Sequence, residues 1–280
     1  MVRKSWIVIL IVVAALGITA LVVFFSTSTR SSTTTLTFDV RDILSEEWVY
    51  DSTITVQDRV IRGYFDTDFR FTNLDTGSGV LKVSAPSYVS REVPVEIRRG
   101  ENTLEQPVDM TGYEIPNLDH FIMIEDVEEG ELVTEVRPVG TDGRAVVNHP
   151  CVDLRLLLLV SEQVYDGELA QSPTEEGSVR GERLFRGALE WRWDSDPGTI
   201  FRYTVPIPVN KFKQSRAPLW VFDYLLIVPD PREIAKDTVD EIVQQVEGIE
   251  DPEAVQEQLD AYEGRIRYFI NTSWNVEAQQ

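Results

Sequence analysis

The sequence predicts a mainly β protein, in which an N-terminal transmembrane helix is followed by two β-sandwich domains and two short helices lie near the C-terminus. Three observations predict this fold class. The stretch Trp6–Phe25 contains no charged residue, short segments of alternating apolar and polar residues follow from Leu36 onward, and apolar residues return at helical spacing after Pro231. A period of two is typical of half-buried strands, whereas a period near 3.6 is typical of amphipathic helices.

The uncharged stretch predicts attachment to a membrane. Its twenty residues, rising about 1.5 Å each, form a helix that crosses a hydrocarbon layer of roughly 30 Å. The best cleavage-like position, near Ala14–Ala20, lies inside the apolar run, which favours an uncleaved signal anchor over a removed signal peptide. Arg3 and Lys4 precede the helix, so the positive-inside rule keeps the N-terminus cytoplasmic and places residues 31–280 outside the cytoplasm.

Changes in composition divide the chain further. Residues 1–30 form the predicted cytoplasmic stub and transmembrane anchor, and residues 31–35 form a Ser/Thr linker. We place the first sandwich at residues 36–110 and the second at residues 117–280, with a helical segment at 232–263 inside the second.

The charge balance excludes one class of partner. The chain has 26 Lys and Arg against 47 Asp and Glu, a net charge of −21. Such an acidic surface repels nucleic acid, so no nucleic-acid partner is expected. Cys151 is the only cysteine, so no intrachain disulfide stabilises the predicted extracytoplasmic domains.

The first domain is predicted from short strands that are separated by glycine-containing turns. The turns are Asp75–Gly79 and Arg99–Asn102, and this arrangement is typical of antiparallel strands in a small sandwich. The predicted strands are Leu36–Val40, Thr53–Val56, Arg59–Tyr64, Asp68–Phe71, Val80–Val83 and Val93–Ile97.

The stretch Phe69–Tyr88, followed by Val93–Ile97 and Gly100–Leu104, resembles the carboxypeptidase regulatory-like domain. That family is a transthyretin-like sandwich, and the related surface modules named after a PEGA tetrapeptide are similar over the same span. Ser87 stands where the family pattern usually has glycine. The resemblance covers residues 36–110, implies a sandwich with an accessory, non-catalytic role, and transfers no active-site residue.

A second group of strands is predicted after a joint at Pro107–Pro116. Leu156–Val160 is apolar on both faces, as in a strand buried within a sandwich. Ser161–Gly181 is polar and acidic and predicts a mobile loop. The predicted strands are Phe121–Ile124, Leu132–Val136, Val152–Val160, Leu184–Trp193, Ile200–Val209 and Leu219–Val228.

Two helices and a final strand are predicted near the C-terminus. Apolar residues recur at helical spacing over Ile234–Val246 and again over Val255–Tyr262, and Pro252 suits an early helical position. The segment Arg265–Trp274 alternates again. Packing of the helices against the second sandwich is favoured over their docking to a partner protein.

Catalytic and metal-binding patterns are scarce, so neither a metal nor another cofactor is predicted. His120 and His149 lack the spacings that build a zinc site. His149 and Cys151 lie two residues apart, and a loop histidine beside a buried cysteine is favoured over a catalytic pair. Asp194–Gly198 resembles the start of a cation-binding loop but lacks the later Glu, which favours a solvated turn.

Trp191 and Trp193 are the candidate ligand or partner face. Two residues apart in a strand, they share a face, where they can stack on a sugar or clamp a partner loop. Leu189 shares this face, which favours burial in the core instead. Asn271 begins an Asn-Thr-Ser glycosylation sequon.

These observations predict a membrane-anchored, extracytoplasmic, non-catalytic module that binds another cell-envelope protein. The alternative is a glycan-binding surface module that uses Trp191 and Trp193. A hydrolase in the second domain, formed from carboxylates that meet in space, is the third hypothesis.

Overall fold

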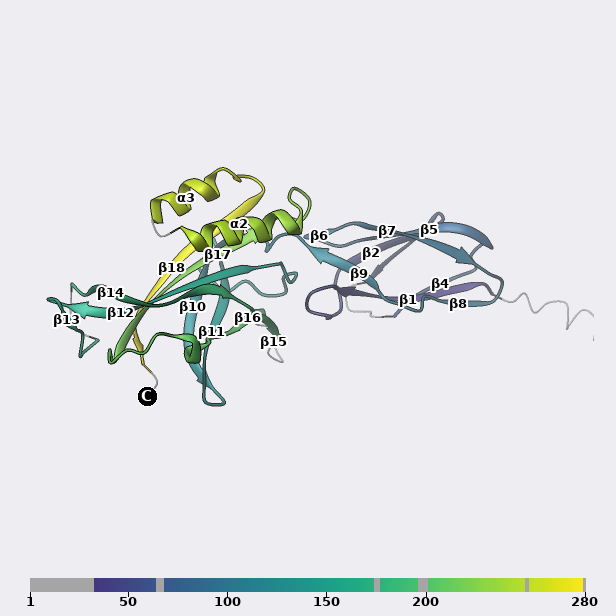
Figure 1. Ribbon diagram of the computed structural model, residues 1–280. Coiled ribbons are helices and arrows are strands. Elements are labelled where there is room, and N and C mark those ends of the chain that lie inside the picture. Colours follow the sequence, from purple (N-terminus) through teal and green to yellow (C-terminus); the bar gives the residue numbers. More distant parts are fainter. Residues whose placement is uncertain (1–32, 64–67, 174–176, 196–200, 250–251, 279–280) are drawn as a thin grey trace, which may run out of the picture.

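The protein is mainly β, as predicted, and its described strands form two units that lie end to end (Figure 1). The computed structural model describes residues 33–63, 68–173, 177–195, 201–249 and 252–278. The predicted anchor, Trp6–Phe25, lies outside these residues. Among the described helices, none has the length and apolar content needed to cross a membrane.

The N-terminal unit is built from two sheets that enclose one core. Strand β1 is central in one sheet, whose order is β4-β1-β9-β6 with β8 also paired to β1, and the other sheet has the order β3-β2-β5-β7. The strands are β1 (Thr35–Asp42), β2 (Ser52–Val56), β3 (Arg59–Gly63), β4 (Asp68–Thr72), β5 (Gly77–Ser84), β6 (Tyr88–Val89), β7 (Arg91–Ile97), β8 (Glu101–Thr103) and β9 (Val108–Gly112).

The apolar side chains of the alternating sequence pattern fill this core. Phe38 of β1 stacks on Phe69 and Phe71 of β4, with ring centroids 5.8 and 6.3 Å apart. Leu81 and Val83 of β5 close the core from the facing sheet. One apolar face therefore suffices for each sheet, and the other face meets solvent.

The predicted joint at Pro107–Pro116 is wrong in part. Residues 108–112 form β9, which pairs in parallel with the end of β1 and antiparallel with β6. Apolar Val108 and Met110 alternate there and are buried in the first core. The connection between the units is therefore shorter than its two prolines indicated.

The C-terminal unit also has two sheets. Their orders are β10-β11-β16-β15 and β13-β12-β17-β18, with β14 paired to β12 in the second. The strands are β10 (Leu118–Glu128), β11 (Glu131–Gly140), β12 (Arg155–Tyr165), β13 (Glu168–Leu169), β14 (Val179–Leu189), β15 (Arg192–Ser195), β16 (Phe201–Pro206), β17 (Leu219–Pro229) and β18 (Ile266–Glu277), and a single 3₁₀ turn, η1, spans Val209–Lys211.

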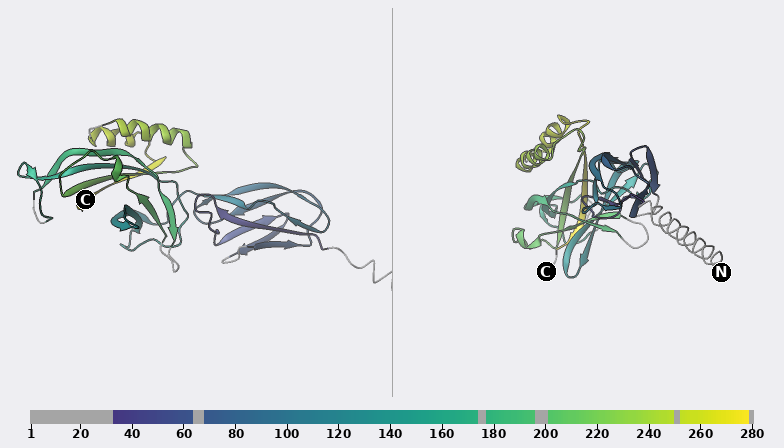
Figure 2. Two further views of the ribbon diagram at one scale, coloured as in Figure 1. Left: turned by 60° about the horizontal axis from the view of Figure 1, so that its bottom comes forward. Right: turned by 90° about the vertical axis from the view of Figure 1, so that its right-hand side faces the viewer.

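Helices α2 (Lys236–Gly248) and α3 (Pro252–Asp260) cover the outer face of the sheet that contains β12, β17 and β18 (Figures 1 and 2). Val239, Ile242 and Val246 of α2 pack with Leu157 and Ile227 in a second apolar cluster. The two predicted helices and the predicted final strand are confirmed. The described apolar faces of the helices pack against the sheet of the second unit.

Strand β12 shows why its sequence is apolar on both sides. Leu156, Leu158 and Val160 face the core between the two sheets, whereas Leu157 faces the helices. The predicted two-sided burial is confirmed, and the second covering layer is helical.

Two predicted boundaries in this unit are wrong. The predicted loop Ser161–Gly181 contains the end of β12, the short β13 and the start of β14, and Asp166 and Gly167 form the turn with φ of 49° and 80°. Positive φ at both positions is typical of an Asp-Gly hairpin turn. The predicted strand Leu184–Trp193 divides after Leu189, because β14 and β15 belong to different sheets.

Candidate functional site

The two units meet in a junction that is held by specific contacts. The backbone N–H of Cys151 donates to Asp42 Oδ2 at 3.1 Å, and Ser195 Oγ donates to Glu47 Oε1 at 2.5 Å. Gly112 approaches the second unit so closely that a Cβ there would lie 2.6 Å from both Cys151 O and Pro150 Cβ. The junction is therefore a packed contact in which a larger residue at position 112 would clash.

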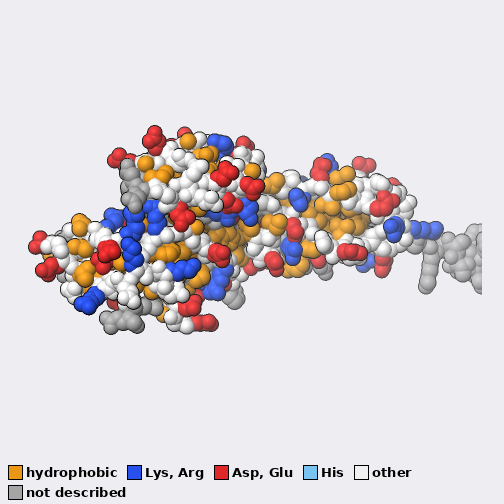
Figure 3. Space-filling model, in the orientation of Figure 1, with side chains coloured by type: hydrophobic (Ala, Val, Ile, Leu, Met, Phe, Trp, Pro, Cys, Tyr) orange, Lys and Arg blue, Asp and Glu red, His pale blue; other side chains and the backbone are white. Residues whose placement is uncertain are grey.

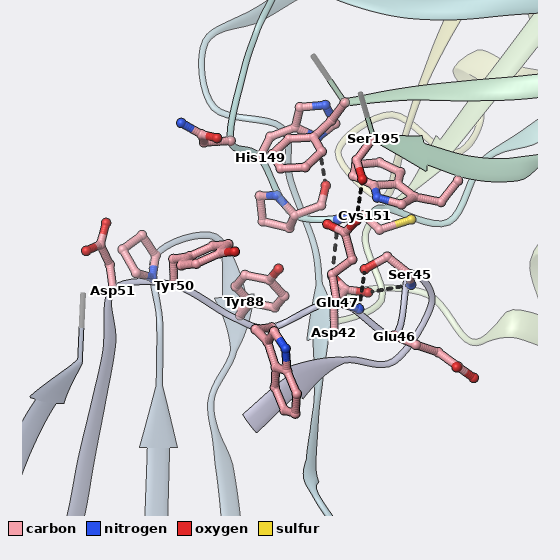
Figure 4. Close-up of a pocket in the computed structure, with 16 residues that line it drawn as sticks. Asp42, Ser45, Glu46, Glu47, Tyr50, Asp51, Tyr88, His149, Cys151 and Ser195 are labelled. Carbon is pink, nitrogen blue, oxygen red and sulfur yellow. Dashed lines mark hydrogen bonds between the residues drawn. The ribbon is translucent and has the colours of Figure 1, made fainter. Parts of the chain in front are cut away.

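A cleft of about 780 Å³ opens at this junction (Figure 4). This volume lies within the range of about 300–1,000 Å³ that is usual for ligand pockets. Figure 4 shows Asp51, Tyr50 and Tyr88 along the side of the N-terminal unit and His149 and Ser195 on the opposite side. The lining is aromatic and acidic, and consists of Asp42, Ser45, Glu46, Glu47, Trp48, Tyr50, Asp51, Pro86, Tyr88, Asn148, His149, Pro150, Cys151, Trp193, Ser195 and Phe201.

The N-terminal wall is a turn that is organised by the carboxylate of Asp42. This side chain is almost fully buried, and its Oδ1 accepts the backbone N–H groups of Leu44 at 2.8 Å and Ser45 at 3.1 Å. Burial raises the pKa of Asp42, and hydrogen bonds from these groups, from Tyr88 and from Cys151 partly oppose that rise. Asp42 thus shapes the turn and joins it to the second unit.

Two aromatic side chains on this wall stay exposed. Trp48 is 41% exposed and Tyr50 is 47% exposed, although both lie between the buried residues of β1 and β2 in the sequence. Trp48 forms an isolated antiparallel bridge with Arg41, and this bridge fixes the backbone that carries it. Large aromatic side chains that are held at the mouth of a cleft are typical of binding surfaces.

Left-handed backbone conformations gather around the cleft. Glu46, Asp51 and Asn148 line it with φ of 60°, 55° and 53°, and Ser87, next to Tyr88, has φ of 63°. This conformation is costly for a residue with a side chain, especially for Glu and Ser, and such strain tends to cluster at functional sites. At Ser87 a glycine would adopt this positive φ without strain.

The C-terminal wall is built on His149, which is 5% exposed. Its Nδ1 donates to the carbonyl of Pro150 at 2.8 Å, and its ring packs edge-on against Trp193 and Phe201. Burial lowers the pKa of His149 to about 4. The predicted loop histidine is therefore a neutral, packed side chain at physiological pH.

Trp191 and Trp193 contact the same core side chain, Tyr203, edge-on at 5.0 and 5.1 Å. Trp191 is partly buried, and its Nε1 donates to the carbonyl of Leu154 at 2.7 Å. Trp193 is also partly buried and lines the cleft. The structure thus brings Trp193, but not Trp191, to the cleft wall.

The cleft gathers His149 with several carboxylates, as the hydrolase hypothesis requires, but the two carboxylates of the junction, Asp42 and Glu47, are engaged in hydrogen bonds of the fold. Asp42 is buried among backbone donors, and Glu47 accepts from Ser195. Burial raises the pKa of the Cys151 thiol, which opposes formation of a nucleophilic thiolate. Together these contacts favour packing over acid–base or nucleophilic catalysis.

Metal ligands do not converge within the described part of the chain, where no group of three His, Cys, Asp or Glu residues could hold an ion. Asp196–Gly198, in the second half of the cation-like loop, lies outside the described residues. Asn271 of the sequon is partly buried and donates its Nδ2 to the carbonyl of Phe121 at 3.0 Å, so glycosylation there would break a bond of the fold.

Sequence reasoning missed the residues that define the cleft. Trp48, Tyr50 and Asp51 follow a short turn in which no motif stands out. The one available signal was the density of aromatic and acidic residues between positions 46 and 51 in a stretch that breaks the strand alternation.

No protein-family model and no curated protein matches the sequence. Among solved structures, one from Bacteroides uniformis ATCC 8492, provisionally named a carbohydrate-binding protein, is aligned over 86% of this chain and 98% of its own, at 10% identity and a TM-score of 0.26. A DUF3823 family protein from Bacteroides ovatus ATCC 8483 is aligned over 70% of this chain and 90% of its own, at 15% identity and a TM-score of 0.24. Likenesses of this size support no statement about fold or ligand.

Proposed function

We propose that this protein is a non-catalytic binding module of the cell envelope. Trp6–Phe25 anchors it, residues 31–280 lie outside the cytoplasm, and part of another envelope protein occupies the junction cleft. The anchor rests on the uncharged segment and the basic residues before it. The family resemblance of residues 36–110 is consistent with an accessory role.

The observation that carries the proposal is the combination of exposed aromatic side chains with a firmly held backbone. Trp48 and Tyr50 expose about two fifths or more of their surface at the cleft mouth. The turn that carries them is tied to the second unit through Asp42 and Glu47. A preorganised wall of this kind loses little entropy when it binds a partner.

The test replaces Trp48 in the full chain with a photo-cross-linking amino acid and irradiates membranes that contain the protein. We expect covalent adducts at position 48. The matched control is Trp274, an indole of similar exposure, 38%, on β18 and away from the cleft. Adducts at both positions, or at neither, would overturn the assignment of the ligand to the cleft.

A glycan is the second candidate occupant, because an exposed indole and phenol beside carboxylates suit a sugar ring and its hydroxyl groups. The predicted glycan face at Trp191 and Trp193 is less suited to this role, because Trp191 donates a hydrogen bond to Leu154 and packs against Tyr203. A glycan would therefore use Trp48 and Tyr50.

A further inference from the structure

The cleft carries an unbalanced charge. Of the described residues that line it, four are carboxylates and none is Lys or Arg. Asp42 and Glu47 have hydrogen-bond donors within the junction, whereas Glu46 and Asp51 are exposed at its mouth. Two carboxylates beside an aromatic wall favour a ligand that brings positive charge.

A neighbouring arginine offsets only part of this charge. Arg41 lies on β1 just before the turn, and its Nε donates to Asp109 at 2.7 Å. The guanidinium is thus engaged with a carboxylate outside the cleft lining. Arg41 also attracts Glu46 electrostatically, so the exposed Asp51 carries most of the negative charge that remains available to a ligand.

The exposed aromatic side chains suit the same kind of ligand. The face of an indole or phenol ring carries negative charge density and attracts ammonium and guanidinium groups. Trp48 and Tyr50 lie next in sequence to the carboxylates, Trp48 two residues after Glu46 and Tyr50 directly before Asp51. Aromatic faces that are flanked by carboxylates accommodate both the apolar stem and the charged head of a Lys or Arg side chain.

Two sheet edges border the cleft and favour a peptide over a glycan. Strand β15 is the last strand of its sheet and carries Trp193 and Ser195, and β6 is the last strand of its sheet and carries Tyr88. Within the described chain each has a neighbouring strand on one side only. A strand edge presents N–H and C=O groups that an extended peptide can pair with.

Resting on the proposed function, we infer that the occupant is an extended segment of the partner protein with Lys or Arg side chains. The segment lies along the β15 edge, and its Lys or Arg side chains rest against Trp48 and Tyr50. Asp51 lies at one end of this wall and Glu46 at the other (Figure 4). The cavity volume accommodates a short peptide segment. The net charge of the chain, −21, attracts such a segment from a distance.

The test measures peptide binding by calorimetry to the full chain in neutral detergent micelles. The probe is an acetylated and amidated peptide of alternating Arg and Val, which presents its cations on one face when extended. The matched probe replaces each Arg with citrulline, which keeps the shape and removes the charge. Maltohexaose is the glycan probe. We expect the Arg peptide to bind at least tenfold more tightly than the citrulline peptide, and its affinity to fall as salt is raised from 50 to 500 mM.

Variants then locate the binding. Glu46→Gln combined with Asp51→Asn should weaken the Arg peptide about tenfold, whereas the control pair Asp58→Asn and Glu131→Gln, also exposed but outside the cleft, should leave it unchanged. Trp48→Ala should weaken it as well, and Trp274→Ala should not. Circular dichroism spectra confirm that each variant is folded.

The outcomes separate this inference from the proposed function. Equal binding of the Arg and citrulline peptides, no binding of either, or equal losses in the cleft and control variants would overturn the cationic peptide. Binding of maltohexaose that Trp48→Ala abolishes would keep the cleft as a binding site but replace the peptide with a glycan. Absence of specific cross-links at position 48 would instead overturn the proposed function itself.

Discussion

The two units differ in how many faces of their sheets are covered, although both are built from two sheets around a core. In the N-terminal unit, β2 alternates strictly between buried and half-buried residues, because its second face meets solvent. In the C-terminal unit, nine of the eleven residues of β17 are buried, because the core covers one face and the helices cover the other. The number of covering layers, rather than the strand itself, thus decides whether a strand sequence alternates or is continuously apolar.

The surface shows a second difference. On the face shown in Figure 3, acidic side chains are scattered over both units, whereas Lys and Arg gather mainly on the C-terminal unit. Two arginines of the C-terminal unit bind within the fold: Arg180 pairs with Asp223, and Arg186 donates to the carbonyl of Val246 near the end of α2. Arg186 thus joins α2 to the sheet, whereas Arg180 joins two strands of the same sheet across β12.

The largest expected effect is a loss of stability on truncating a leucine in either core, and it tests whether the two cores unfold independently. Leu81 in the N-terminal core and Leu158 in the C-terminal core are both fully buried, so Leu81→Ala and Leu158→Ala should each cost about 2–5 kcal/mol. Because the cores are separate clusters, each substitution should lower one transition in differential scanning calorimetry of the full chain. A single transition that both substitutions lower equally would show that the units unfold together.

Acid should affect the two units in opposite directions. Burial lowers the pKa of His149 from 6.5 to about 4, so between these pH values the unfolded chain takes up a proton that the folded chain refuses. Stability that is present above pH 6.5 is therefore lost as the pH falls toward 4, by about 3 kcal/mol. Burial raises the pKa of Asp42, so the stability contribution of Asp42 increases as the pH falls through its folded pKa toward 3.8.

Urea unfolding at a series of pH values measures this difference. His149→Phe should remove the loss of stability between pH 6.5 and 4, whereas His120→Gln, at an exposed ring, should leave it in place. A pH profile that is identical in wild type and His149→Phe would contradict the buried, neutral histidine.

The sequence predicted the strands that bury apolar side chains and missed those that bury polar side chains. Phe69 and Phe71 alternate visibly, and their strand was predicted. Gln163 of β12 is also buried, but through hydrogen bonds to Ser178 and Asn275, and its polar neighbourhood resembled a loop. A polar residue does not reveal in a sequence whether its hydrogen-bond partner is water or a distant side chain.

The cleft was beyond sequence reasoning for a related reason. Asp42 and Cys151, which join its walls, are 109 residues apart, and neither belongs to a recognisable motif. Trp193 was singled out and does line the cleft, but Trp48 and Tyr50 were not. Which exposed residues meet across a junction depends on the relative placement of two units, and local periodicity carries no information about it.

The junction itself should be sensitive to one methyl group. Gly112→Ala places a Cβ against Pro150 and the carbonyl of Cys151, which leave it no room, so we expect a loss of about 1–3 kcal/mol. The control is Gly248→Ala at the end of α2, where a Cβ meets nothing within 4 Å. Calorimetry should show destabilisation for the first substitution and little change for the second. Equal effects would mean that the close approach at Gly112 does not hold the units together.

The smallest expected effect is the coupling free energy of a single ion pair, which we compare between the two units. Lys82 and Glu92 face each other across β5 and β7 at 2.7 Å, and both side chains are about 60% exposed, so a double-mutant cycle should give no more than about 1 kcal/mol. The matched pair in the C-terminal unit is Arg202 and Glu135 at 2.8 Å, with side chains only 14% and 9% exposed. Because solvent screens the first pair and protein shields the second, 1 M salt should abolish the coupling of Lys82 with Glu92 and leave most of the coupling of Arg202 with Glu135. Cycles in urea with and without salt measure both couplings. If salt reduced the two couplings by the same fraction, the outer face of the β11–β16 sheet would be as open to solvent as the N-terminal unit, and the contrast between the units would be confined to their cores.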